Sequence, residues 1–161
     1  MKAFFVALRS AVFSAGFILF WGWVAWSLHR RYDSSLGVAL PAWTRELGIA
    51  LLAVGGILAL ACIATFFTRA EGTPAPFDPP RKFVAAGPYN FVRNPMYIGG
   101  FIVLVGFGLY EQSPAILFFA PLWLLLAHLL VIFYEEPHLR ATFGTTYEDY
   151  CRSVRRWIPR L

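Results

Sequence analysis

The chain has 161 residues, of which 58% are hydrophobic, 18% aromatic and only 14% charged, and its formal net charge is +5. An ordinary soluble domain, in which about a quarter of the residues are charged, is excluded by this composition. The positive charge does not indicate nucleic-acid binding, because the cations flank apolar segments and no recognition motif accompanies them. We therefore expect an integral membrane protein.

Four apolar segments follow one another along the chain, and each reaches or approaches the roughly 20 residues that cross a hydrocarbon core. They cover residues 6–28, 47–67, 95–110 and 115–134. The third segment is short, so we expect it to end below one interface or to begin in a recess. The sequence thus predicts an all-α integral membrane fold with about four transmembrane helices and a C-terminal amphipathic interfacial helix.

We expect a single membrane-embedded domain over residues 1–161, made of N-terminal spans (1–68), a loop (69–94), a helical hairpin (95–134) and a C-terminal tail (135–161). The N-terminal segment is kept as a span because Arg9 interrupts its apolar run, which is untypical of a signal peptide. Neither Cys62 nor Cys151 has metal-ligand neighbours, so no metal site is expected.

Lys and Arg residues concentrate in the loop 69–94 and in the tail, whereas the turn between the third and fourth spans carries none. The positive-inside rule then places the loop and the tail in the cytoplasm, in what we expect to be a bacterial inner membrane. Because successive loops alternate between the two sides of the membrane, this orientation puts Arg30, Arg31 and Arg45 outside, against the rule. A re-entrant or tilted first span therefore remains an alternative.

Asn94 and Pro95 are typical of an N-cap followed by the first turn of a helix. The free N–H groups at such a helix start attract an anion, and Arg93 would add a charged donor. The alternative is an ordinary capped helix whose Arg93 reaches a lipid phosphate.

Glu135 and Glu136 follow the fourth apolar segment, and we expect them at its C-terminal end, where the helix dipole disfavours negative charge. A cation should offset them. Arg140, four residues after Glu136, is the internal candidate, and the ammonium or sulfonium of a ligand is the functional one. Together with the anion-binding helix start, these carboxylates would suit a zwitterionic amino acid moiety.

The tail beyond Pro137 is typical of an amphipathic interfacial helix, which Thr145 and Glu148 would start as a capping box. Its tyrosines could cover a ligand or anchor the helix in the headgroup region. Glycines of the third segment favour close helix packing over a nucleotide loop. These are Gly99, Gly100, Gly106 and Gly108.

Residues 87–160, nearly half of the chain, resemble the isoprenylcysteine carboxyl methyltransferase and phospholipid methyltransferase superfamily of integral membrane enzymes. The Arg-His-Pro-x-Tyr-x-Gly element of that superfamily is matched by Arg93, Pro95, Tyr97 and Gly99. Its second element is matched by Glu135, Glu136, Leu139, Phe143, Gly144, Tyr147 and Tyr150. Two departures stand out: Asn94 replaces the usual His, and Val131 replaces an Arg that orients a substrate carboxylate in the carboxyl methyltransferases.

The resemblance implies that S-adenosylmethionine is held between the two elements, with a carboxylate of the glutamate pair near its amino group. It implies catalytic roles for Glu135, Glu136 and Arg93. The cofactor-binding residues that it implies are Asn94, Pro95, Tyr97, Gly99, Glu135, Glu136, Tyr147 and Tyr150.

The expected function is methyl transfer to a lipidic or hydrophobic small-molecule acceptor at the cytoplasmic membrane face. An amine or thiol acceptor must lose a proton, for which Glu135, Glu136 and His128 are candidates. Two alternatives remain. The Tyr150-Cys151 and Ile158-Pro159 pairs also resemble the tail of NADPH-dependent membrane sterol reductases, and a non-catalytic membrane scaffold would need no cofactor at all.

Overall fold

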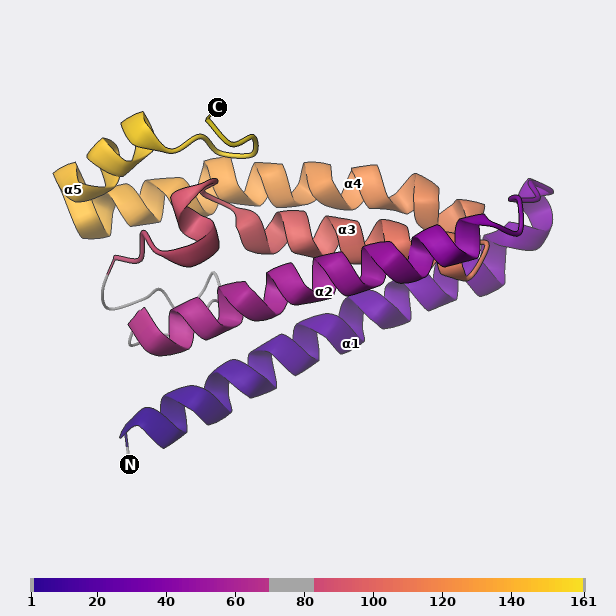
Figure 1. The fold of residues 1–161 in the computed structure, drawn as a ribbon, viewed down its shortest axis with the longest axis horizontal. Coiled ribbons are helices and arrows are strands. Elements are labelled where there is room, and N and C mark those ends of the chain that lie inside the picture. Colours follow the sequence, from indigo (N-terminus) through magenta and orange to yellow (C-terminus); the bar gives the residue numbers. More distant parts are fainter. Residues whose placement is uncertain (1, 70–82, 161) are drawn as a thin grey trace.

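The computed structural model describes residues 2–69 and 83–160, and the regular structure in them is entirely helical (Figure 1). Arg81 and Lys82, on which the predicted orientation partly depends, lie outside the described residues. The elements are α1 (Lys2–Leu36), α2 (Thr44–Arg69), the 3₁₀ turn η1 (Gly87–Asn90), α3 (Pro95–Tyr110), α4 (Pro114–Leu130), the π-helical turn η2 (Val131–Glu135) and α5 (Glu136–Ser153).

Helices α2 and α3 pack with their backbones in contact, because glycines face each other along the interface (Figure 1). A Cβ on Gly55 would lie 2.8 Å from the carbonyl oxygen of Gly99, and one on Gly48 would lie 2.7 Å from that of Gly106. The prediction that glycines of α3 permit close helix packing is therefore confirmed for Gly99 and Gly106. This contact fixes the position of α3 along α2, and with it the position of the polar groups at the start of α3.

The C-terminal end of α1 holds the turn between α3 and α4. Asp33 Oδ1 accepts a hydrogen bond of 2.9 Å from the backbone N–H of Ala115, and Asp33 Oδ2 lies 2.6 Å from His29 Nδ1. Ser113 Oγ, at the N-cap of α4, accepts a hydrogen bond of 3.2 Å from Ile116 N. Two free backbone N–H groups at the start of α4 thus donate to side chains, one from α1 and one from the turn. These bonds fix the closed end of the hairpin.

Two helical segments in the described residues are long and apolar enough to cross a membrane, namely Thr44–Phe66 and the continuous run Pro114–Ser153. Helix α3 is apolar but has only 16 residues, as the sequence predicts. Large apolar side chains are exposed on α1, α2 and α4, among them Trp23, Ile57 and Phe118. Such a surface suits contact with lipid. The all-helical membrane fold is supported, whereas the number of spans stays a prediction.

The helix that carries the glutamate pair does not end there, and the expectation that it does is wrong. Glu136 N donates to the carbonyl oxygen of Val131, five residues earlier, in a π-helical turn. This wider turn shifts the hydrogen-bond pattern directly ahead of Pro137, which lacks an N–H, and the helix passes the proline. Glu135 and Glu136 therefore lie inside a continuous helical run, away from the unpaired carbonyls of a helix end.

The helical run bends at Gly144 instead, where φ is 52° and ψ is −129°. Only glycine adopts this backbone region readily. The bend directly precedes Thr145, where the sequence predicts a helix start. It lets the second half of α5 and the segment that follows run back over α4 (Figure 1). Tyr147, Tyr150 and Val154 are thereby buried together.

Candidate active site

The start of α3 is joined to the segment that follows α5. Asn94 occupies the predicted N-cap position, but its side chain makes no capping hydrogen bond. Instead Asn94 Nδ2 donates to the carbonyl oxygen of Arg156 at 3.2 Å, and Arg93 N donates to that of Arg155 at 2.9 Å. Within the described residues 2–69 and 83–160, the first backbone N–H groups of α3 therefore have no side-chain cap.

Glu136 lies at the centre of a cluster of arginines, although only 3% of the residue is exposed. Its Oε1 accepts a hydrogen bond of 2.6 Å from Arg156 Nε, and its Oε2 accepts one of 3.0 Å from Arg156 Nη2. Arg93 Nη1 lies 3.3 Å from Oε1, and Arg140 Nη2 lies 3.4 Å from Oε2. The internal partner Arg140 is confirmed, and two further arginines, which local sequence did not predict, join it.

These charges decide the protonation of the cluster. Burial alone would raise the pKa of the Glu136 carboxyl, but the hydrogen bond from Arg156 and the charges of the neighbouring arginines outweigh it and hold that pKa below its usual value. The hydrogen bond to Glu136 in turn raises the pKa of Arg156 above its usual value. Glu136 is therefore a fully ionised carboxylate that the protein itself already neutralises.

Glu135 has different surroundings, although it is the adjacent residue. The Tyr97 hydroxyl donates a hydrogen bond to Glu135 Oε1. In the part of the chain that the structure describes, no basic side chain is close enough to form an ion pair with Glu135. Consecutive residues of a helix point about 100° apart, so the two carboxylates face different neighbours. Among the described residues, the partner of Glu135 is therefore a neutral hydroxyl, whereas Glu136 is surrounded by guanidinium groups.

The tyrosines of the tail fix the second half of α5 against the loop before α3. Tyr150 donates a hydrogen bond of 2.6 Å to the carbonyl oxygen of Tyr89, and Tyr147 is only 2% exposed. The ring of Phe83 packs edge-on against both. Arg93 Nη1 also donates to Cys151 Sγ at 2.6 Å. Tyr147 and Tyr150 thus border the arginine cluster from the tail side.

Trp157, which is not among the predicted site residues, also belongs to this region. Its indole Nε1 donates a hydrogen bond of 2.9 Å to Nδ1 of His128, and its ring lies edge-on to Tyr97 with centroids 6.5 Å apart. His128, one of the candidate bases, is thus a hydrogen-bonded residue that reaches the site through Trp157. Because Nδ1 accepts this bond, it is not free to take a proton from an acceptor.

An apolar cavity of about 240 Å³ adjoins the polar groups between α1, α3 and α4. Its walls include Phe17 and Trp21 from α1, Tyr97 from α3, and Trp123, Ala127 and Leu130 from α4. Tyr97 therefore belongs both to this cavity and to the hydrogen bond with Glu135. The chain thus brings an aromatic cavity next to a charged cluster.

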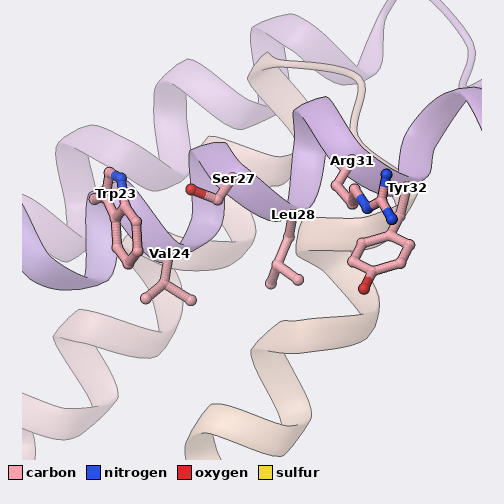
Figure 2. Close-up of a pocket in the computed structure, with 6 residues that line it drawn as sticks. All are labelled: Trp23, Val24, Ser27, Leu28, Arg31 and Tyr32. Atoms are coloured by element: carbon pink, nitrogen blue, oxygen red, sulfur yellow. The ribbon is translucent and has the colours of Figure 1, made fainter.

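A larger hollow of about 410 Å³ lies along α1 and is lined only by residues of that helix (Figure 2). They are Trp23, Val24, Ser27, Leu28, Arg31 and Tyr32. This hollow extends toward the end of α1 that holds the start of α4, whereas the glutamates follow the other end of α4. None of the predicted site residues lines it, so we do not place the active site there.

The predicted site residues divide into two groups. Around the start of α3 meet Arg93, Asn94, Tyr97, Glu135 and Glu136, with Pro95 buried as the first residue of that helix, and Tyr147 and Tyr150 border them. Gly99 faces the other way, since a Cβ there would lie 3.1 Å from the carbonyl oxygen of Gly55 on α2. Its contact is with the neighbouring helix.

Comparison with known proteins identifies the family of the chain. Residues 43–146 match the model of a family described as phospholipid methyltransferase. Since the match covers well over half of the chain, the protein belongs to that family. The match takes in α2, the loop, the hairpin and the glutamate pair.

The relatives of the chain include a protein named for metal resistance and one named as a methyltransferase. The chain is 31% identical over 133 residues to the nickel-cobalt-cadmium resistance protein NccN of Alcaligenes xylosoxydans xylosoxydans, covering 83% of this chain and 56% of that protein. It is 30% identical over 122 residues to protein-S-isoprenylcysteine O-methyltransferase A of Arabidopsis thaliana, covering 73% and 60%. The chain thus spans a little over half the length of the curated relatives that it matches.

The fold is similar to a solved structure of the eukaryotic intramembrane Ras methyltransferase ICMT (isoprenylcysteine carboxyl methyltransferase). The TM-score is 0.61 and the sequence identity is 22%, and the match covers 91% of this chain and 52% of the other. At this identity the likeness establishes the fold alone.

Proposed function

We propose that this chain catalyses S-adenosylmethionine-dependent methyl transfer to a lipidic or hydrophobic small-molecule acceptor, at the cytoplasmic boundary of a bacterial inner membrane. The observation that carries the proposal is the position of Tyr97, which lines the aromatic cavity and donates a hydrogen bond to Glu135 in the polar cluster. A soluble cofactor and an apolar acceptor can approach such a residue from opposite sides. Membership of the phospholipid methyltransferase family supports this assignment.

The residues around the start of α3 fit the amino acid moiety of the cofactor. Among the residues that the structure describes, Arg93 Nε is buried without a hydrogen-bond partner, and the start of α3 has no side-chain cap. A buried donor without a partner costs free energy, which a bound carboxylate would recover. Glu135, with no ion-pair partner in the described part of the chain, suits the ammonium group. The donors and the carboxylate thus complement a zwitterion.

S-adenosylmethionine, when bound, supplies an electrophilic methyl group. The protein must then align the nucleophile and exclude water, because a displacement at carbon gains most from proximity and orientation. The apolar cavity walls, Trp123 among them, would hold and desolvate the acceptor. For an acceptor that must lose a proton, Glu135 is the candidate base, since Nδ1 of His128 is occupied by Trp157.

The acceptor atom is constrained by Val131. It is 1% exposed and stands where the carboxyl methyltransferases have an arginine that orients the substrate carboxylate. The chain offers no charge at that position to hold a carboxylate acceptor. An acceptor screen should therefore include lipidic amines and thiols as well as isoprenylated cysteine.

The test is calorimetric titration of the detergent-purified protein with S-adenosylmethionine and S-adenosylhomocysteine, with NADPH as the control ligand. We expect binding of both sulfur ligands, its loss in Glu135→Gln, and its retention in Glu111→Gln at the opposite end of the hairpin. Transfer of a labelled methyl group into a membrane lipid extract would follow. Binding of NADPH alone would favour the reductase, and no binding of any of the three would favour the scaffold.

A further inference from the structure

We infer that Glu136 is a positioning residue that holds the C-terminal segment 154–157 across the start of α3, whereas Glu135 alone of the pair contacts the cofactor. The inference rests on the proposed function and assigns different roles to two adjacent carboxylates. It adds Arg156 and Trp157, which lie outside the matched motif elements, to the residues on which the reaction depends.

Glu136 has little capacity left for a ligand. Both of its oxygens accept hydrogen bonds from Arg156, at 2.6 Å and 3.0 Å, and Arg93 and Arg140 approach the same oxygens. A ligand ammonium placed beside this carboxylate would also face three guanidinium groups and would be repelled by them. Because only 3% of the residue is exposed, contact with a ligand would further require removal of one of these arginines.

The segment 154–157 is fixed at several consecutive residues. Val154 is buried with the tail tyrosines, the carbonyl oxygens of Arg155 and Arg156 accept hydrogen bonds from Arg93 N and Asn94 Nδ2, and Trp157 donates to His128. The Arg156 side chain, bound to Glu136, joins the segment to the start of α5. The segment therefore connects the beginning of α3 with the last turns of α4 and with the glutamate pair.

Placement of this segment determines the surroundings of Tyr97. The Trp157 ring lies edge-on to the Tyr97 ring, and the Tyr97 hydroxyl donates to Glu135. A continuous set of contacts thus leads from Glu136 through Arg156 and Trp157 to Tyr97 and Glu135. Loss of the Glu136–Arg156 pair should release Trp157 and loosen Tyr97, without removing any group proposed to contact the cofactor.

The experiment compares Glu135→Gln, Glu136→Gln, Arg156→Lys and Trp157→Phe, with Arg152→Gln as the control. Arg152 is on the same tail but its side chain is 76% exposed and pairs only with Asp149 in the described residues. Three quantities are measured on the full chain in detergent: calorimetric affinity for S-adenosylhomocysteine, methyl transfer, and hydrogen exchange of peptides that contain Arg93 and residues 152–160. Exchange reports the segment directly, because Arg93 N–H is bonded to it.

We expect Arg156→Lys and Trp157→Phe to exchange faster in these peptides and to lose about 10- to 100-fold in turnover, as for small misplacements of reacting groups. Their affinity for S-adenosylhomocysteine should stay within about a factor of three, because no binding group is lost. Glu136→Gln should behave in the same way. Glu135→Gln should lose ligand binding while exchange at Arg93 stays as in the unmodified protein.

The inference is overturned if Glu136→Gln abolishes ligand binding while exchange in both peptides stays unchanged, since Glu136 would then be a ligand contact. It is also overturned if Arg156→Lys and Trp157→Phe match Arg152→Gln in all three measurements. Failure of the unmodified protein to bind either sulfur ligand would refute the proposed function. The exchange data would still decide whether Glu136 holds the segment.

Discussion

Tyr97 and Glu135, 38 positions apart in the sequence, are joined by a hydrogen bond from the tyrosine hydroxyl to the carboxylate. The bond links the first turn of α3 to the π-helical turn after α4, at the open end of the hairpin. Tyr97 also lines the apolar cavity, so this pair lies at the boundary between the charged cluster and that cavity.

Tyr97→Phe keeps the ring in the cavity wall and removes only the hydroxyl that donates to Glu135. A buried carboxylate left without this partner should cost about 1–3 kcal/mol of stability, and methyl transfer should fall by about tenfold or more. Thermal unfolding and turnover are the measurements. Tyr110→Phe, at the other end of α3 and 43% exposed, is the control and should leave both unchanged.

The hairpin could be predicted closely from sequence because its signals are local. Pro95 begins α3 and the short turn before Ala115 forces antiparallel helices, and both boundaries follow from residues adjacent in the chain. The two motifs were expected to hold one ligand between them, whereas the direct ion pair of Arg93 with Glu136 was not predicted. What local sequence could not show is that neighbouring glutamates on one helix face different partners.

Arg156 and Trp157 escaped prediction for a physical reason. Their partners Glu136 and His128 lie 20 and 29 positions away, and the bend at Gly144 brings them together. In sequence, Arg155 and Arg156 are typical of solvated or lipid-facing cations, and nothing in their spacing distinguishes one that is bound to a buried carboxylate. Likewise, the helix was expected to end where the fourth apolar segment ends, because the π turn that lets it continue past Pro137 has no clear sequence pattern.

Acid should destabilise the protein through Glu136. Its pKa in the folded state lies below its usual value because Arg156 and the other arginines outweigh the effect of burial. Its contribution to stability is therefore present above the pKa of the unfolded chain, about 4.3, and is lost as the pH falls through the lower folded value. Thermal unfolding measured between pH 3 and 7 should show this loss. The Glu136→Gln variant should be less stable than the unmodified protein at pH 7, and its stability should vary less between pH 3 and 7. An equally steep pH dependence of stability in the variant would contradict this role of Glu136.

Two adjacent glycines of α2 give a matched test of the contact between α2 and α3. A Cβ on Gly55 would lie 2.8 Å from the carbonyl oxygen of Gly99 and from Val103, whereas one on Gly56 would meet nothing within 4 Å. Gly55→Ala should therefore destabilise the protein by about 1–3 kcal/mol, and it should weaken methyl transfer because α3 carries Tyr97. Gly56→Ala should be neutral or stabilising by up to about 1 kcal/mol, since alanine has the better helix propensity. Chemical denaturation in detergent would measure both, and equal effects of the two substitutions would argue against backbone contact at Gly55.

Gly144 tests whether the bend in α5 places the tail on the site. Its φ of 52° with ψ of −129° is strained for any L-residue, although an added Cβ would meet no atom within 4 Å. Gly144→Ala should thus cost about 1–3 kcal/mol through backbone strain alone. If the chain relieves that strain by straightening, Trp157 moves away from Tyr97, and methyl transfer should fall by more than the loss of stability explains. Gly22→Ala in α1, where an added Cβ also meets nothing within 4 Å and no positive φ is required, is the control. Unfolding temperature and turnover measured on both variants would separate strain from position: unchanged turnover in folded Gly144→Ala would show that the reaction does not depend on the bend.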